Sequence, residues 1–177
     1  MKKRFDNAIS DYSDAIDINP EFAVAYQNRG SAYFIKGDYQ KAISDYSKAL
    51  KLNPDDAVIY TSRGMAYLSE KDYQKALEEF NKAIELNPEY ANAYINRGTC
   101  YNHIHQINKA AADYKKALEL NPGSALNKKM TKYIELAASG WNFQNPYRYP
   151  VPDGQASYIQ DSGPAGYGGG GYTGLKN

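Results

Sequence analysis

Apolar and small residues recur along the first part of the chain in two alternating patterns, each with the i, i+4, i+7 spacing of one helix face. The first pattern is an aromatic residue, a glycine and a tyrosine, as at Tyr26, Gly30 and Tyr33. The second is an aromatic residue between two alanines, as at Ala42, Tyr46 and Ala49. Gly37-Asp38 separates the two patterns, with Asp38 as the expected N-cap of the second helix. The sequence therefore predicts helix hairpins.

The hairpins return at a fixed interval. Successive prolines of the Asn-Pro pairs, Pro20, Pro54, Pro88 and Pro122, are 34 residues apart. A glycine within a helix costs about 0.5–1 kcal/mol relative to alanine, so its return at Gly64 and Gly98 predicts the close approach of a neighbouring helix. A hairpin of this kind buries its second face only by stacking on the next one, as repeat proteins do.

A 34-residue helix–turn–helix unit with these aromatic, glycine, alanine and proline positions resembles the tetratricopeptide repeat (TPR). The resemblance implies an all-α fold, a right-handed α-solenoid of TPR helix hairpins. It divides the chain into a partial repeat at 1–22, which has the second helix alone, complete repeats at 23–56, 57–90 and 91–124, a capping helix at 125–140, and a disordered tail rich in Tyr, Gly and Pro at 141–177.

One column departs from the family pattern. The residue before each glycine is Arg29, Arg63 or Arg97, where the family often has leucine. We expect each arginine stem to pack within the array and each guanidinium to pair with a carboxylate of an adjacent helix.

The N-terminal partial repeat leaves an apolar stripe without the hairpin partner that it expects. The stripe consists of Phe5, Ala8, Ile9, Tyr12, Ala15 and Ile16. Two interpretations stay open: the chain is a fragment of a longer protein, or another chain supplies the missing face and gives a homo-oligomer or a heteromer.

Charge and composition narrow the function classes. Lys and Arg number 21 against 20 Asp and Glu, which argues against a nucleic-acid partner. No apolar run reaches the roughly 18 residues of a membrane span. The single cysteine, Cys100, cannot form a disulfide within the chain, and this fits a reducing, cytoplasmic location.

Candidate chemical sites are weak. The glycine-rich segment 163–174 lacks the Gly-Lys-Ser/Thr ending of a phosphate loop. Cys100, His103 and His105 lie close in sequence, but a zinc site requires more ligands. We therefore expect no enzymatic activity, no cofactor and no metal.

In TPR arrays the first helices line a concave groove, so the resemblance implies that this is the ligand surface. The predicted peptide contacts are Val24, Gln27, Asn28, Ser31, Phe34, Thr61, Ser62, Met65, Asn92, Ile95, Asn96, Thr99 and Asn102. The same face carries Ile35, Val58, Leu68, Ser69 and His103. Asn28 and Asn96 resemble the asparagines with which the family holds a peptide backbone, because an amide offers both donors and an acceptor. Ser62 interrupts that series.

A subset of the family clamps the C-terminal carboxylate of heat-shock chaperones with Lys, Asn and Arg. Here Gln27, Asn92 and Asn96 stand where the clamp has charged residues, so we expect no such clamp and a neutral or moderately apolar extended peptide instead. The predicted function is a protein–protein interaction scaffold or adaptor. The alternatives are an assembly scaffold that acts through the N-terminal stripe and a regulatory fragment of a larger protein.

Overall fold

The computed structural model describes residues 2–122 and 127–138 of the 177-residue chain. Within these residues it contains eight α-helices and no strand. In chain order the helices are α1 (Lys2–Ile18), α2 (Ala23–Lys36), α3 (Tyr39–Leu52), α4 (Ala57–Ser69), α5 (Tyr73–Leu86), α6 (Ala91–His103), α7 (Ile107–Leu120) and α8 (Asn127–Ala138). The tail predicted at 141–177 lies outside the described residues.

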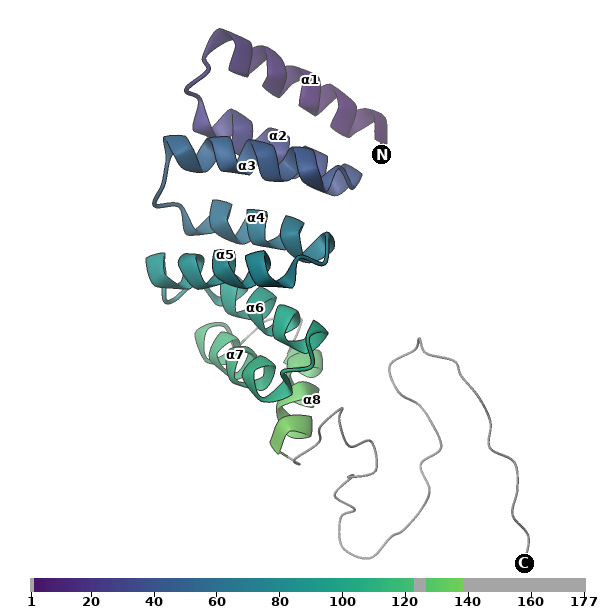
Figure 1. Ribbon diagram of the computed structural model, residues 1–177, viewed down its shortest axis with the longest axis vertical. Coiled ribbons are helices and arrows are strands. Elements are labelled where there is room, and N and C mark those ends of the chain that lie inside the picture. Colours follow the sequence, from purple (N-terminus) through teal and green to yellow (C-terminus); the bar gives the residue numbers. More distant parts are fainter. Residues whose placement is uncertain (1, 123–126, 139–177) are drawn as a thin grey trace, which may run out of the picture.

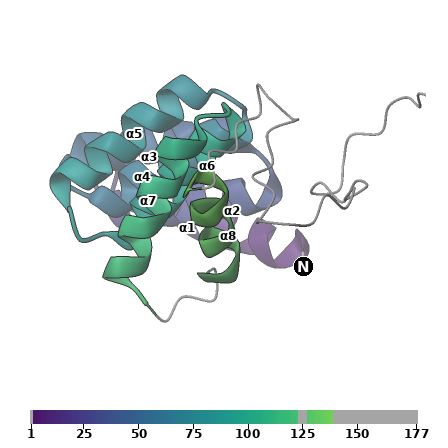
Figure 2. The ribbon, with the colours of Figure 1, turned by 90° about the horizontal axis from the view of Figure 1, so that it is seen from below.

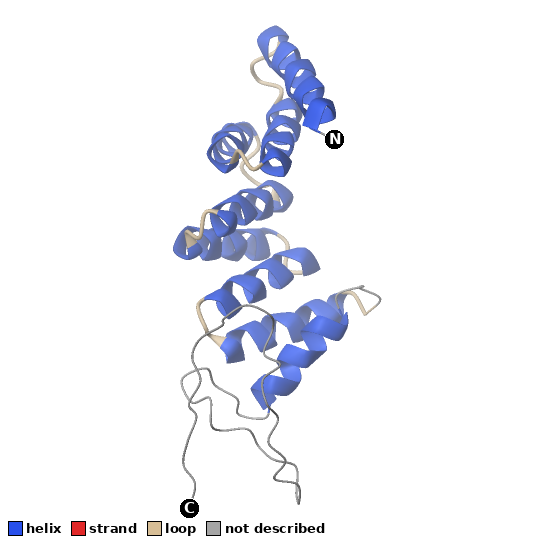
Figure 3. Ribbon diagram, turned by 90° about the vertical axis from the view of Figure 1, so that its right-hand side faces the viewer, coloured by secondary structure: helices blue, strands red, loops and turns tan. Residues whose placement is uncertain are grey.

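The helices form an elongated stack that follows the chain. Figure 1 shows α1 at one end of the stack and α7 with α8 at the other, and Figure 3 shows the same stack from its side. The hairpins are α2–α3, α4–α5 and α6–α7, and each packs on the next because α3 contacts α4 and α5 contacts α6. The predicted all-α solenoid of helix hairpins is therefore confirmed.

Helix α8 covers the last hairpin. Met130 of α8 is only 3 % exposed, and it packs with Ile134 into one apolar cluster with Tyr94 and Tyr114. The capping helix predicted at 125–140 is thus present, with the bounds Asn127–Ala138 within the described residues.

The three recurring glycines allow two helices of a hairpin to touch. A Cβ atom built on Gly30 would lie 3.0 Å from Cε1 of Tyr46, and one on Gly98 would lie 2.8 Å from Cε1 of Tyr114. On Gly64 it would lie 2.6 Å from Cε1 of Phe80, closer than real Cβ atoms approach. The predicted reason for the glycine column, close approach of a neighbouring helix, is confirmed.

The turns inside the hairpins use a left-handed residue. Gly37 has φ 87°, and the equivalent positions Lys71 and His105 have φ 63° and 60°. Asp38 follows at the N-cap of α3, but its side chain accepts no capping hydrogen bond, whereas Asp72 at the same place before α5 accepts one from the backbone N–H of Lys75. Asp38 is therefore the N-cap by position only.

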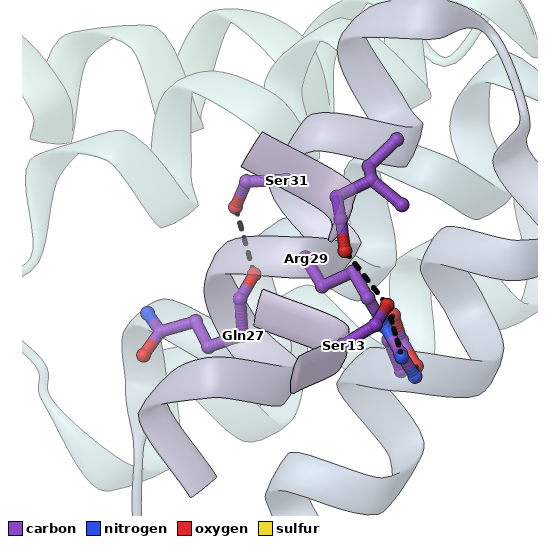
Figure 4. Close-up of polar contacts among 6 residues, drawn as sticks. Ser13, Gln27, Arg29 and Ser31 are labelled. Atoms are coloured by element: carbon purple, nitrogen blue, oxygen red, sulfur yellow. Dashed lines mark hydrogen bonds and ion pairs between the residues drawn. The ribbon is translucent and has the colours of Figure 1, made fainter. Parts of the chain in front are cut away.

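Each arginine of the predicted column joins three helices. The Nε and Nη2 groups of Arg29 both donate to the carboxylate of Asp45 on α3, at 2.8 Å each. Its Nη1 group donates to Oγ of Ser13 on α1 at 3.0 Å (Figure 4). These hydrogen bonds to Asp45 raise the pKa of Arg29. The expected pairing of the guanidinium with a carboxylate of an adjacent helix is confirmed.

The other two arginines repeat this geometry with small changes in chemistry. Arg63 donates twice to Glu79, at 3.0 and 2.8 Å, and once to Ser47. Arg97 donates twice to Asp113, at 2.8 and 2.7 Å, and once to Oδ1 of Asn81. In each case the arginine links its own hairpin to the second helix before it. These hydrogen bonds therefore stabilise the packing of successive repeats.

Candidate functional site

The first helices of the three hairpins form one continuous side of the stack. Helix α4 contacts both α2 and α6, in addition to its own hairpin partner α5. Figure 2 looks along this stack, with α7 and α8 at the near end. The residues predicted as peptide contacts therefore belong to three helices that contact one another in order.

A small pocket opens between α2 and α4. Its volume is about 200 Å³, and its lining residues are uncharged: Ser31, Phe34, Ile35, Tyr46, Ser62 and Met65. Four of these were predicted as peptide contacts, namely Ser31, Phe34, Ser62 and Met65. An uncharged pocket of this kind suits the side chain of an apolar residue.

Tyr46 lines this pocket although sequence reasoning placed it only in the core. It is 2 % exposed, and its hydroxyl donates to Oγ of Ser31 at 3.2 Å. Burial raises the pKa of this tyrosine, so the neutral phenol is the form that lines the pocket. The equivalent residue of the next repeat, Phe80, lacks this hydroxyl.

The hydroxyl groups on this side are already engaged as donors. Ser31 donates to the carbonyl oxygen of Gln27 at 3.0 Å, which Figure 4 shows, and Ser62 donates to that of Val58 at 2.8 Å. Thr99 donates to the carbonyl oxygen of Ile95 at 2.9 Å. These hydroxyls can still accept a hydrogen bond, but their protons are directed at their own helix.

The amides differ from the hydroxyls. Asn28 and Asn96 are half-buried, and among the described residues neither side chain makes a hydrogen bond. Asn92 is exposed and Gln27 is half-buried on the same side. The donors that remain for a ligand on this surface are therefore side-chain amides.

Thr61 has to be removed from the predicted contacts. Its side chain is 3 % exposed, and its hydroxyl donates to the carbonyl oxygen of Ala57 at 2.9 Å. The prediction is wrong because this position turns toward the neighbouring helices in α4, where a threonine is small enough to be enclosed. Gln27 and Ile95, its counterparts in the other repeats, remain half-buried.

The surface changes from apolar to polar along the array. Val24 and Val58 are 51 % and 45 % exposed, and their counterpart in the third repeat is Asn92. Ile35 is 59 % exposed, and its third-repeat counterpart is His103, which stacks on Tyr73 with 5.7 Å between ring centroids. Phe34 and Leu68 are followed by Asn102 in the same column. Exposed aliphatic side chains thus gather on α2 and α4.

Cys100 and the two histidines do not gather into a site. Cys100 is completely buried beside the carbonyl oxygen of Tyr73, and burial raises the pKa of its thiol to about 11. His103 and His105 are exposed. Across residues 2–122 and 127–138, no cluster of three or more His, Cys, Asp or Glu side chains is arranged to hold a metal ion.

Of the helices that the structure describes, none combines the length and the apolar character needed to cross a bilayer.

The repeat spacing and the stacked hairpins have a counterpart among known proteins. The tetratricopeptide repeat family model matches residues 23–56, 57–90 and 91–124. This chain belongs to the tetratricopeptide-repeat family. The first helices described above are therefore the first helices of three consecutive TPRs, and α1 stands before them.

Solved TPR structures share this arrangement. The first TPR domain of human RPAP3 is 31% identical, with a TM-score of 0.65, over 73% of this chain and 100% of that chain. The first TPR of Spaghetti (RPAP3) bound to HSP90 peptide SRMEEVD is 31% identical, with a TM-score of 0.62, over 66% of this chain and 94% of that chain. MamA is 25% identical, with a TM-score of 0.65, over 85% of this chain and 91% of that chain.

Proposed function

We propose that this TPR protein is an adaptor that binds an extended peptide along α2, α4 and α6, with one apolar side chain of the peptide in the pocket between α2 and α4. The observation that carries the proposal is the pocket itself, because it is uncharged and lies on the side where the first helices meet. Its volume of about 200 Å³ is below the range of roughly 300–1,000 Å³ for drug-sized ligands and suits a single side chain.

The amides provide the polar part of the recognition. An extended peptide presents a backbone N–H and a backbone carbonyl at each residue, and an asparagine side chain can satisfy both. Asn28 lies on α2 and Asn96 lies on α6, and neither side chain is engaged by another described residue. They are the groups that hold the peptide backbone in this proposal.

The change in polarity along the array defines the ligand further. The aliphatic side chains Val24, Ile35 and Val58 favour apolar residues in the part of the peptide that lies over α2 and α4. The amides of Asn92 and Asn96 favour polar, uncharged residues in the part that lies over α6. The ligand class is thus a neutral peptide with an apolar and a polar end.

Binding of a chaperone tail by this chain is disfavoured on the same grounds. The HSP90 peptide SRMEEVD, which is bound to the TPR of Spaghetti (RPAP3), contains three acidic side chains. Gln27, Asn92 and Asn96 offer no positive charge to a carboxylate. Charge-assisted hydrogen bonds are about twice as strong as neutral ones, so their absence weakens the binding of an acidic tail.

The proposal is tested by peptide selection followed by measured affinities. Random peptides are selected against the full chain, and the best ones are measured by fluorescence anisotropy against the parent, Asn28→Ala/Asn96→Ala, Met65→Lys and the control Asn108→Ala. Asn108 is an exposed asparagine on the second helix α7, away from the pocket. We expect neutral, partly apolar peptides whose affinity falls at least about tenfold, or 1.4 kcal/mol, in the first two variants and stays unchanged in the control.

A second comparison separates neutral from acidic ligands. SRMEEVD should bind the parent more weakly than a selected neutral peptide, and Gln27→Lys/Asn92→Arg should reverse that order by adding cationic donors. Selected peptides that bind Asn28→Ala/Asn96→Ala and Met65→Lys as well as the parent would exclude this surface as the binding site.

A further inference from the structure

Three hydroxyl groups line the pocket between α2 and α4, and they belong to Ser31, Tyr46 and Ser62. The hydroxyl of Tyr46 donates to Oγ of Ser31 at 3.2 Å. Ser31 and Ser62 each donate to the carbonyl oxygen four residues earlier on their own helix. The oxygen atoms keep lone pairs, so these groups can accept a hydrogen bond from a ligand but have no proton to offer it.

The next interval along the array, between α4 and α6, has different chemistry. The counterparts of the three hydroxyl residues there are Met65, Phe80 and Asn96. A thioether, a phenyl ring and an amide thus replace the hydroxyls. The group of hydrogen-bond acceptors between apolar walls is therefore a property of the first interval.

This chemistry selects the side chain that the pocket can hold. A purely apolar side chain would exclude water from the hydroxyl oxygens without replacing its hydrogen bonds, which costs free energy. A carboxylate or an amide carbonyl would find no donor. A phenol places a ring against the apolar walls of Phe34, Ile35 and Met65, and its O–H can donate to the hydroxyl oxygens. The pocket therefore matches a tyrosine side chain.

The chain itself has tyrosines in a nearly uncharged segment after α8. The segment 142–152 reads Asn-Phe-Gln-Asn-Pro-Tyr-Arg-Tyr-Pro-Val-Pro and lies outside the described residues. Its amides come first, at 142, 144 and 145, and two tyrosines and a valine follow, at 147, 149 and 151. Since successive side chains of an extended chain point to opposite sides, 147, 149 and 151 share a side that excludes Arg148, the one charged residue of the segment.

The order of these residues matches the order of the first helices. Helix α8 contacts α7, α7 contacts α6 and α6 contacts α4, so a chain that leaves α8 meets α6 before it meets the pocket. Figure 1 shows α8 at the end of the stack, beyond α6. The amides of the segment would lie over α6, which carries Asn92 and Asn96. The tyrosines and the valine would lie over α2 and α4, where Val24 and Val58 are exposed.

The length of the segment selects one of its two tyrosines. Packed helices lie about 8–10 Å apart, so the three contacts from α8 through α7 and α6 to α4 span at most roughly 30 Å. The nine residues from Ala138 to Tyr147 cover about 30–32 Å when extended, which leaves almost nothing for displacement along the helices. The eleven residues to Tyr149 cover about 36–40 Å. Trp141 also has a donor, but it follows Ala138 by three residues, or about 10 Å.

We propose that the segment 142–152 binds across α6, α4 and α2 of its own chain, with the Tyr149 side chain in the pocket and its hydroxyl donating to the hydroxyl oxygens there. An external peptide then binds by displacing this segment. Competition of this kind reduces the apparent affinity by the fraction of molecules whose pocket is open. The inference rests on the proposed function, because both use the same pocket.

Occupation of the pocket can be tested without any added peptide. Met65 lines the pocket, so the NMR signal of its terminal methyl group responds to an aromatic ring placed there. The full chain, labelled at its methionine methyl groups, is compared with Tyr149→Ala and with the control Tyr172→Ala, which removes another tyrosine after α8. We expect Tyr149→Ala to move the Met65 signal and Tyr172→Ala to leave it in place. The signal of Met130, which is buried beside α7, should stay in both variants.

A selected neutral peptide measures the competition. Its affinity should be about tenfold higher for Tyr149→Ala than for the original chain and unchanged for Tyr172→Ala. Tyr149→Phe keeps the ring and removes the donor, so it should raise the affinity by a smaller factor. Binding within one chain does not depend on protein concentration, so the Met65 signal should be the same after about tenfold dilution.

A Met65 signal that Tyr149→Ala leaves unchanged overturns the proposal. A signal that changes on dilution also overturns it, because the segment of a second copy would then fill the pocket. A peptide that binds the original chain and Tyr149→Ala equally well excludes the competition and leaves the proposed function intact. If selection yields no peptide at all, the proposed function fails, and the Met65 comparison still decides whether Tyr149 fills the pocket.

Discussion

The first two complete hairpins, α2–α3 and α4–α5, share a backbone plan and differ in what their central aromatic residue does. Tyr46 and Phe80 occupy the same place against Gly30 and Gly64 and are both enclosed, at 2 and 0 % exposure. Only Tyr46 has a hydroxyl, which reaches Ser31 and lines the pocket. One oxygen atom therefore separates a residue that only fills the core from one that also shapes a surface.

The ion pairs of the two hairpins differ in a similar way. Arg29 pairs with the shorter Asp45, and Arg63 pairs with Glu79, yet the donor–acceptor distances are nearly the same, at 2.8 and 2.8 Å against 3.0 and 2.8 Å. A repeat thus preserves the contact and tolerates a change in the residues that make it.

Truncation of the central ring should have the largest effect. Phe80→Ala is expected to lower the free energy of unfolding by about 3–5 kcal/mol, because a fully buried ring leaves a cavity. Tyr46→Ala should cost a similar amount despite its hydroxyl. Urea denaturation followed by circular dichroism measures both, and an effect below about 1 kcal/mol for either variant would contradict the assigned core.

Removal of an arginine should rank second. Arg63→Met leaves Glu79 without its partner in a site where the two side chains are 17% and 13% exposed, so we expect a loss of about 3 kcal/mol. The double variant Arg63→Met/Glu79→Leu should recover most of that loss, since no buried charge remains. Urea midpoints of the single and double variants give the comparison, and a double variant as unstable as the single one would show that the ion pair itself is required.

The glycine column should distinguish the two hairpins directly. Gly64→Ala is expected to cost about 1–2 kcal/mol through overpacking, because the added Cβ would lie 2.6 Å from the ring of Phe80. Gly30→Ala should cost less, because the corresponding distance to Tyr46 is 3.0 Å. Thermal melts of the two variants side by side would refute this ranking if Gly30→Ala proved the more damaging.

Exchange of the hydroxyl should have a smaller effect on stability than on binding. Tyr46→Phe removes the hydrogen bond to Ser31 and should cost about 0.5–1.5 kcal/mol. It should also change which peptides are selected, because the pocket loses the hydroxyl of Tyr46. Phe80→Tyr is the matched control, and peptide affinity unchanged by Tyr46→Phe would mean that the pocket wall does not contribute to recognition.

The smallest effect concerns the N-cap residues and depends on pH. The side chain of Lys75 and the backbone N–H of Lys75 both donate hydrogen bonds to the Asp72 carboxylate. These hydrogen bonds lower the pKa of Asp72 below its ordinary value of 3.8. The unfolded chain binds the proton more readily, so the stabilisation from Asp72 is present above pH 3.8 and is lost as the pH falls through the lowered native pKa.

Asp72→Asn should therefore weaken the fall in the free energy of unfolding as the pH drops below 3.8. Urea denaturation at a series of pH values above and below 3.8 measures this dependence. Asp38→Asn should lower the free energy of unfolding less than Asp72→Asn, because the Asp38 side chain makes no capping hydrogen bond. An equal effect of the two substitutions would mean that the caps are equivalent in solution.

Much of the fold could be predicted because it depends on local periodicity and side-chain size. The i, i+4, i+7 spacing defined the helices, and the glycine at Gly30, Gly64 and Gly98 required a close partner, which proved to be an aromatic ring. The arginine pairing was also predictable, since a recurring cation inside a packed array requires an anion. For the predicted peptide contacts, the sequence indicated only which face of each helix they share, not how exposed each side chain is.

The 34-residue period, the three hairpins and the family follow from the order of residues along the chain. The enclosure of Thr61 and the place of Tyr46 in the pocket wall become evident only when the helices are packed together. The physical reason is the difference in sequence separation between the residues that interact. Helix periodicity acts over a few neighbouring residues, whereas burial, pocket shape and ion pairing depend on distances between helices that the chain brings together only after it folds.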